Sequence, residues 1–120
     1  IHRAADMGAI RAKSMALTDL FIRLVEERCA GHGFTLASPR EAAARGSQVS
    51  FAHADGYPIM RALIAAGVIG DFRAPDTVRF DFTPLYVGYA DVWDAVDRLL
   101  TIMDGGIWKR PEHQIRDAVT

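Results

Sequence analysis

The 120-residue sequence has few of the residues from which self-contained catalytic and metal sites are usually built. Its single cysteine, Cys29, excludes an internal disulfide and is typical of a reducing cytoplasm. The four histidines lie at no metal-ligand spacing, and His53, at the end of an alternating segment, is expected to be structural. The only lysines are Lys13 and Lys109. We therefore expect no metal site and no catalytic residue in this chain.

Strong charge and long hydrophobic runs are also missing from the sequence. The sequence has fourteen Lys and Arg residues and fifteen Asp and Glu residues, mixed along the chain, and its formal net charge is −1. This balance provides no basic field for nucleic acid. No run approaches the roughly 18 apolar residues that a membrane span requires, and no segment resembles a signal peptide. The composition predicts an ordinary globular protein of the cytoplasm, without nucleic-acid or membrane partners.

The first part of the chain carries the longest helical pattern. Ile10, Leu17 and Phe21 recur at helical spacing and predict a helix over residues 4–30, which glycines then end. At 1.5 Å per residue this helix is about 40 Å long, which is long for a lone small domain. The chain also opens on Ile1 without a cap or linker. We expect residues 1–32 to bridge toward a large domain that precedes this chain, and residues 33–120 to form a small α/β domain.

The remaining pattern alternates short strands with helices. Strands are predicted over residues 34–37, 47–53, 68–73 and 77–82, and helices over residues 38–45, 55–66 and 89–104. The tail over residues 107–120 is polar, with room for one short helix. This order predicts an α+β two-layer sandwich, in which a small, mostly antiparallel sheet carries helices on one face. The other face would carry Gln48, Ser50 and Arg79 and look toward a ligand or a partner domain.

Arg79 lies in the middle of the alternating segment over residues 77–82. Val78 and Phe80 fall on one face of such a strand, and Arg79 falls on the other. A strand aims the planar guanidinium group, which suits two-pronged binding of a carboxylate or phosphate. The alternative is a solvated arginine on an exposed sheet face. Arg79 is the candidate binding residue of the chain.

Four segments of the sequence resemble the C-terminal domain of the kynureninase family. These segments are RGSQVSF (residues 45–51), GVIGDFRAP (67–75), VRF (78–80) and TPLY (83–86). They occur in the family's order and close to its spacing, and the resemblance extends from about residue 11 to the C-terminus. It implies the small C-terminal domain of a fold-type I pyridoxal-phosphate enzyme, of the aspartate aminotransferase-like superfamily.

The resemblance also implies an activity and its partners. Kynureninase hydrolyses the Cβ–Cγ bond of L-kynurenine to anthranilate and L-alanine, in tryptophan catabolism that leads toward NAD. Its pyridoxal phosphate is held by a lysine of the large domain, so neither Lys13 nor Lys109 takes that role, and the cofactor is not expected in this chain. The family is a homodimer. This chain alone would be inactive.

Within the resemblance, Arg79 matches the family's arginine that binds the substrate α-carboxylate. Arg73 matches a second family arginine and is expected to support the site or the domain contact. Asp81, two residues beyond Arg79, stands where the family would have a small residue. It could hold Arg79 or compete with the substrate, and we favour a strand geometry that takes Asp81 outside the pocket.

Two alternatives to kynureninase stay open at the level of the sequence. Class V aminotransferases and cysteine desulfurases share the general layout of the small domain. A non-catalytic α/β module that binds a small ligand or a protein is the other alternative. The sequence does not separate kynurenine from 3-hydroxykynurenine as the substrate.

Overall fold

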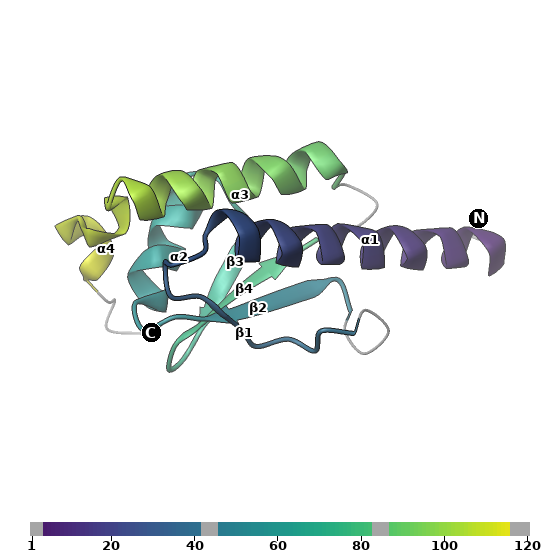
Figure 1. Cartoon of the computed structure of the whole chain (residues 1–120), viewed down its shortest axis with the longest axis horizontal. Coiled ribbons are helices and arrows are strands. Elements are labelled where there is room, and N and C mark those ends of the chain that lie inside the picture. Colours follow the sequence, from purple (N-terminus) through teal and green to yellow (C-terminus); the bar gives the residue numbers. More distant parts are fainter. Residues whose placement is uncertain (1–3, 42–45, 83–86, 116–120) are drawn as a thin grey trace.

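A computed structural model describes residues 4–41, 46–82 and 87–115 of the chain (Figure 1). The order of elements alternates helices with short strands along the chain. These elements are α1 (Ala4–Arg28), β1 (Thr35–Leu36), β2 (Gln48–Ala52), α2 (Gly56–Ala65), β3 (Gly70–Arg73), β4 (Thr77–Asp81), α3 (Tyr89–Asp104), the 3-10 helix η2 (Ile107–Lys109) and α4 (Pro111–Gln114).

The four strands form one antiparallel sheet in the order β1-β2-β4-β3. Strand β4 therefore lies between β2 and β3, and its residues are hydrogen-bonded on both sides. The register places Ser50 of β2 and Asp71 of β3 directly opposite Arg79 of β4. Side chains that are opposite each other across antiparallel strands share one face of the sheet. Ser50, Arg79 and Asp71 thus form a row across three strands.

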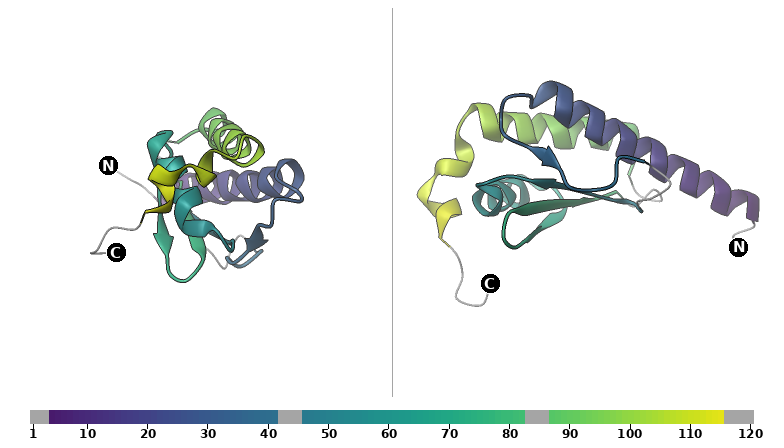
Figure 2. Two further views of the ribbon diagram at one scale, coloured as in Figure 1. Left: turned by 90° about the vertical axis from the view of Figure 1, so that its left-hand side faces the viewer. Right: turned by 60° about the horizontal axis from the view of Figure 1, so that its bottom comes forward.

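The helices cover one face of this sheet. Helices α1 and α3 run side by side above the strands, and the two views of Figure 2 show the same layering from other directions (Figures 1 and 2). Val49, Phe51, Val78 and Phe80 point toward the helices and are buried, whereas the residues between them are less buried. The predicted α+β two-layer sandwich with helices on one face is confirmed. Its other sheet face is not covered by any described helix.

Phe21 of α1 stands at the centre of the hydrophobic core. Its side chain is fully buried, and its ring centroid lies 6.1 Å from that of Phe51 and 4.7 Å from those of Phe80 and Phe82. Tilted and edge-on aromatic pairs at these separations are favourable beyond their buried area. Phe51 of β2, Phe80 of β4 and Phe82, which directly follows β4, therefore fix α1 onto the sheet.

The N-terminal half of α1 extends beyond the sheet and beyond the start of α3 (Figure 1). Met7 is 56% exposed, and Leu17 is the first residue of the helix described as buried. The observed helix ends at Arg28, close to the predicted end. That residues 1–32 bridge toward a preceding large domain stays a prediction.

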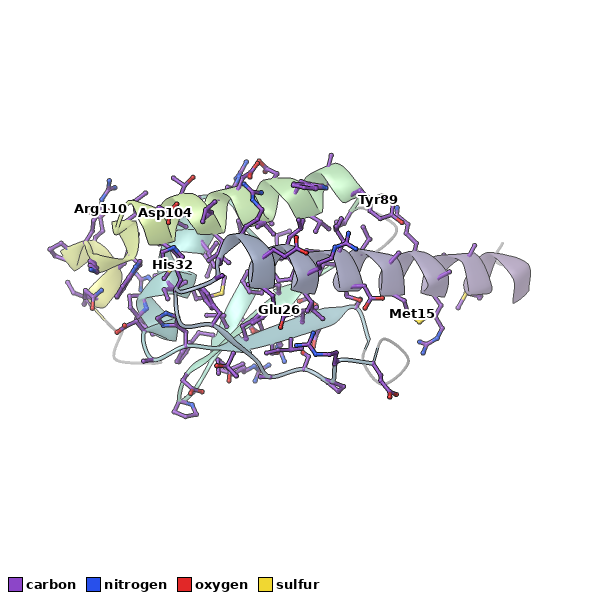
Figure 3. All side chains as sticks on the ribbon, in the orientation of Figure 1. Met15, Glu26, His32, Tyr89, Asp104 and Arg110 are labelled. Carbon is purple, nitrogen blue, oxygen red and sulfur yellow. The ribbon has the colours of Figure 1, made fainter. Side chains whose placement is uncertain are left out.

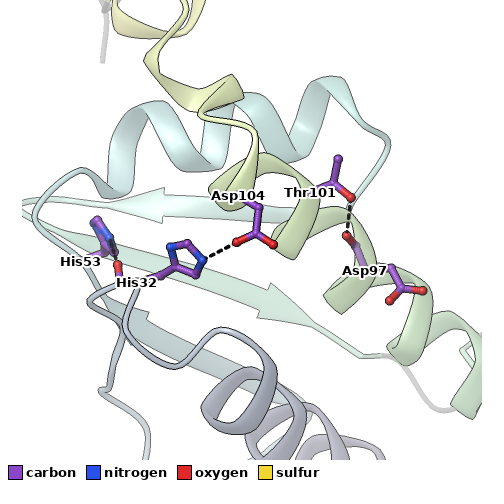
Figure 4. Close-up of polar contacts among 5 residues, drawn as sticks. All are labelled: His32, His53, Asp97, Thr101 and Asp104. Carbon is purple, nitrogen blue, oxygen red and sulfur yellow. Dashed lines mark hydrogen bonds and ion pairs between the residues drawn. The ribbon is translucent and has the colours of Figure 1, made fainter.

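The C-terminal end of α1 is tied to α3 and to the sheet through two histidines (Figure 4). His32 Nε2 lies 2.7 Å from Asp104 Oδ1 at the end of α3, and the His32 carbonyl accepts a hydrogen bond of 2.7 Å from His53 Nε2. The backbone N–H of Asp55 donates to His53 Nδ1 at 2.9 Å. Both ring nitrogens of the buried His53 thus bind backbone groups, so His53 is structural as expected.

The short helix predicted over residues 38–45 is wrong in the part that the structure describes. Residues 38–41 are not helical, and residues 42–45 lie outside the described ranges. The Ser38 hydroxyl group, at the start of the predicted helix, instead accepts a hydrogen bond of 2.8 Å from the backbone N–H of Ser50. The backbone N–H groups of Ala37 and Ser38 bind the Ser50 carbonyl. Pairing with β2 therefore takes the groups that a helix start would have used.

Candidate functional site

Arg79 lies on the uncovered face of the sheet, on the interior strand β4. Its side chain is 24% exposed. The residues before and after it in the strand, Val78 and Phe80, are buried beneath the helices, which sets the direction of Arg79 away from the core. The expectation that Gln48, Ser50 and Arg79 share the uncovered face agrees with the sheet register.

Asp71 of β3 binds the Arg79 guanidinium group with two parallel hydrogen bonds. Arg79 Nε donates to Asp71 Oδ1 at 3.0 Å, and Arg79 Nη2 donates to Asp71 Oδ2 at 2.7 Å. Two-pronged charged pairs of this kind are among the stronger hydrogen bonds in proteins and fix the orientation of both groups. The site is therefore an arginine whose side chain is already held in place by the neighbouring strand.

Arg73 joins the same cluster from the end of β3. Its Nε lies 3.7 Å from Asp71 Oδ2, and its side chain is 61% exposed. Asp71 thus contacts two guanidinium groups at once. The structure brings together the two arginines that the sequence singled out, Arg79 and Arg73, through a carboxylate that the sequence analysis did not include. We call Arg73, Asp71 and Arg79 the arginine cluster.

Asp81 makes no ion pair with Arg79 among the residues that the structure describes. It lines a cavity of about 290 Å³ at the edge of the sheet, together with Gly67, Asp94 and Arg98. Residues directly opposite on paired strands are nearer to each other than residues two apart on one strand. This geometry explains why Arg79 binds Asp71 and not Asp81, although both carboxylates were available.

The sequence contains a signal for the pairing of Asp71 with Arg79 in the spacing of the predicted hairpin. The strands predicted over residues 68–73 and 77–82 leave residues 74–76 as the turn between them, and a tight turn fixes the pairing of the strands that flank it. Counting back from the turn pairs Arg73 with Thr77, and Asp71 with Arg79, as the structure shows. The partner of Arg79 was therefore available from the hairpin register.

A second two-pronged ion pair lies on the helix side of the molecule and serves as a comparison. Arg40 Nη1 and Nη2 donate to Glu26 Oε1 and Oε2 at 3.0 and 2.6 Å, and Figure 3 labels Glu26 on α1. The hydrogen bond from Arg40 lowers the pKa of Glu26. The Arg40 side chain is 66% exposed, against 24% for Arg79. The side chain of Arg79 is thus the less exposed of these two arginines.

The described residues hold no group of three or more His, Cys, Asp and Glu side chains arranged to bind a metal ion. Within the same residues, no helix is both long and apolar enough to cross a membrane. Chemically, the arginine cluster is suited to binding an anion, because guanidinium groups donate hydrogen bonds and accept none. A carboxylate or a phosphate matches the planar geometry of Arg79.

The fold and the arginine cluster define a small α+β domain that presents Arg79, paired with Asp71, on an uncovered sheet face. A family model described as "Kynureninase C-terminal domain" matches residues 10–99. A kynureninase from Pseudomonas fluorescens is 56% identical over 120 residues. Kynureninases from Burkholderia mallei (strain SAVP1) and Burkholderia pseudomallei (strain K96243) are each 57% identical over 120 residues. The chain belongs to the kynureninase C-terminal domain family.

These comparisons confirm the resemblance read from the four sequence segments. Each match covers 100% of this chain and 29% of the relative, so the chain spans less than a third of the length of these kynureninases. Of the four segments, TPLY over residues 83–86 lies outside the described residues. The other segments contribute β2, β3 and β4, and they include the whole arginine cluster.

The residues of the arginine cluster do not by themselves fit pyridoxal phosphate, because neither lysine of the chain belongs to the cluster. Lys13 is on α1, in the N-terminal half that extends beyond the sheet. Lys109 is in η2, where its Nζ lies 5.4 Å from the centre of the Trp108 ring. Neither lysine of the chain is therefore placed to hold an aldehyde cofactor at the arginine cluster.

Proposed function

We propose that this chain is the substrate-carboxylate-binding part of a cytoplasmic, homodimeric kynureninase, which hydrolyses the carbon–carbon bond of L-kynurenine to give anthranilate and L-alanine. The observation that carries the proposal is Arg79, held on the uncovered sheet face of a domain of this family. In this proposal Arg79 binds the α-carboxylate of the substrate, and Arg73 supports the site. The activity resides in the whole protein, and this chain alone is inactive.

The proposed role follows from what such a reaction needs. The relatives are kynureninases, and pyridoxal phosphate, bound by the large domain, would supply the electron sink for bond cleavage. The protein must then fix which bond of the substrate is oriented for cleavage. A two-pronged contact between a guanidinium group and the substrate carboxylate removes rotational freedom and so provides this orientation. Placing Arg79 on a separate small domain allows domain closure to complete the site.

The substitution Arg79→Lys in the full-length protein tests the proposal. Lysine keeps the positive charge but loses the planar, two-pronged contact. We expect kcat/KM for L-kynurenine to fall by roughly 100-fold or more, because the loss of such a contact costs several kcal/mol of transition-state stabilisation. Arg40→Lys removes a similar two-pronged contact on the helix side and is the matched control, with kcat/KM within about twofold of the wild type. Unchanged kcat/KM in Arg79→Lys would overturn the assignment.

A second experiment tests where the cofactor binds. Pyridoxal phosphate is added to the isolated 120-residue chain and to the full-length protein, and absorbance is recorded. The proposal expects a Schiff-base band assigned to one lysine in the full-length protein alone. Such a band on Lys13 or Lys109 of the isolated chain would contradict the division of roles proposed above.

A further inference from the structure

The guanidinium group of Arg79 has two edges that can bind a carboxylate with parallel hydrogen bonds. One edge consists of Nε and Nη2, and the other of Nη1 and Nη2. Asp71 occupies the first edge, with hydrogen bonds of 3.0 Å from Nε and 2.7 Å from Nη2. Since an arginine has five N–H donors, the contact with Asp71 uses two and leaves three on the second edge and its surroundings.

Asp71 is itself fixed relative to Arg79 by the sheet. The two residues are direct partners in the ladder between β3 and β4, so their backbones cannot move independently without opening this pairing. A carboxylate on such a scaffold sets the position and the plane of the guanidinium group. The two hydrogen bonds to Asp71 therefore fix the direction in which the Nη1–Nη2 edge of Arg79 points.

Arg73 makes this arrangement compatible with binding an anion. Asp71 alone would neutralise Arg79, but Asp71 also lies 3.7 Å from Arg73 Nε. Two guanidinium groups and one carboxylate leave the arginine cluster with a net charge of +1. The cluster thus keeps its attraction for a carboxylate although Arg79 is already paired.

From this geometry we propose that Asp71 is a positioning residue, which holds Arg79 by its Nε–Nη2 edge so that the Nη1–Nη2 edge receives the substrate carboxylate. The inference rests on the proposed function of Arg79. Asp71 acts through Arg79 and does not itself touch the substrate. A ligand carboxylate adds to the pair and does not displace Asp71.

The substitution Asp71→Asn in the full-length protein tests this role with L-kynurenine as the substrate. Asparagine keeps the shape of the side chain but replaces one acceptor by a donor, so only one of the two hydrogen bonds remains possible. Arg79 keeps its charge and still attracts the substrate, but the orientation of its guanidinium group is no longer fixed. We expect kcat to fall by about 10-fold or more, because small misplacements of an orienting group are costly, and KM to change by less than about threefold.

The matched control is Glu26→Gln, which removes the charge from the carboxylate of the other two-pronged ion pair, the one between Glu26 and Arg40. Its kcat and KM should stay within about twofold of the wild type. A double-mutant cycle with Arg79→Lys then separates positioning from a general effect on the structure. In the Arg79→Lys background, Asp71→Asn should change kcat by less than about twofold, since the group that it positions is gone.

The outcomes of this cycle test the positioning role of Asp71 and the proposed function of Arg79 separately. A loss of kcat that disappears in the Arg79→Lys background supports the positioning role. An equal loss in both backgrounds, or a wild-type kcat in Asp71→Asn while Arg79→Lys is impaired, overturns the positioning role and leaves the proposed function intact. A wild-type kcat/KM in Arg79→Lys overturns the proposed function itself.

A measurement on the unmodified protein covers the case in which Asp71→Asn fails to fold. A crystal structure of the full-length protein is determined with L-alanine, the proposed amino-acid product. We expect Asp71 to remain on Nε and Nη2 of Arg79, with the alanine carboxylate on the Nη1–Nη2 edge. A carboxylate that replaces Asp71, or that binds away from Arg79, would refute the positioning role.

Discussion

The substitution Gly70→Ala would test how closely β3 must approach β4 to form the arginine cluster. Gly70 precedes Asp71 and pairs with Phe80. A Cβ atom at Gly70 would lie 2.4 Å from the carbonyl oxygen of Arg79 and 3.1 Å from Met60 Cε. Real Cβ atoms essentially never approach another heavy atom closer than 3.0 Å, so β3 would have to move by at least about 0.6 Å. The obstacle is backbone and cannot rotate away.

The expected cost of Gly70→Ala is about 2–3 kcal/mol, toward the upper end for overpacking, because the hydrogen bonds between β3 and β4 must lengthen. The assay is urea denaturation of the 120-residue chain, followed by far-ultraviolet circular dichroism. With a slope of about 2 kcal/mol per M for a chain of this size, the urea midpoint should fall by about 1–1.5 M.

Gly46→Ala provides the matched control for this experiment. A Cβ atom at Gly46 meets nothing within 4 Å, and Gly46 is not among the glycines with positive φ. Its replacement should leave the midpoint unchanged or raise it slightly, because alanine restricts the unfolded chain, by about 0.4–1 kcal/mol. A Gly70→Ala protein within about 0.5 kcal/mol of the wild type would show that β3 moves freely and would refute the close approach.

Two further predictions concern the core. Phe21→Ala should destabilise the chain by about 3–5 kcal/mol and Phe21→Leu by clearly less, measured by urea denaturation; equal costs would contradict the central place of the aromatic ring. Burial raises the pKa of the Cys29 thiol from 9.0 to about 11, since the thiolate would lose its hydration. The contribution of the Cys29 thiol to the free energy of unfolding is therefore fully present below about pH 9. It decreases by at most about 3 kcal/mol as the pH rises toward 11. A Cys29→Ala protein should lack this part of the alkaline loss, and identical pH profiles would exclude it.

Elements with a strong local pattern were predicted closely from the sequence. The helix predicted over residues 89–104 has these bounds in the structure. The Gly88 N–H donates to the Asp91 carboxylate at its start, and Gly106 adopts a positive φ just after its end. Both ends therefore depend on local contacts. The hairpin of β3 and β4 is also local, because a short turn joins strands that pair with each other.

Contacts between segments that are distant in sequence were beyond the sequence analysis. The insertion of β4 between β2 and β3 depends on how the strands pack under the helices, which hydrophobic periodicity does not specify. The hydrogen bond from the Ser50 N–H to the Ser38 hydroxyl group is another contact between distant segments. It explains why no helix begins at Ser38. At the site, the sequence indicated Arg79 and Arg73 but not the carboxylate between them. Side-chain pairing across strands became visible only with the register.

The interior position of β4 has a consequence for how the proposed site moves. Binding residues are often on loops, where local opening requires little free energy. Arg79 instead belongs to a strand that is hydrogen-bonded to β2 on one side and β3 on the other. Exposing its backbone to solvent exchange requires both ladders to separate, which approaches unfolding of the whole domain. The backbone at Arg79 is therefore expected to move toward a ligand only when the whole domain moves as a rigid body.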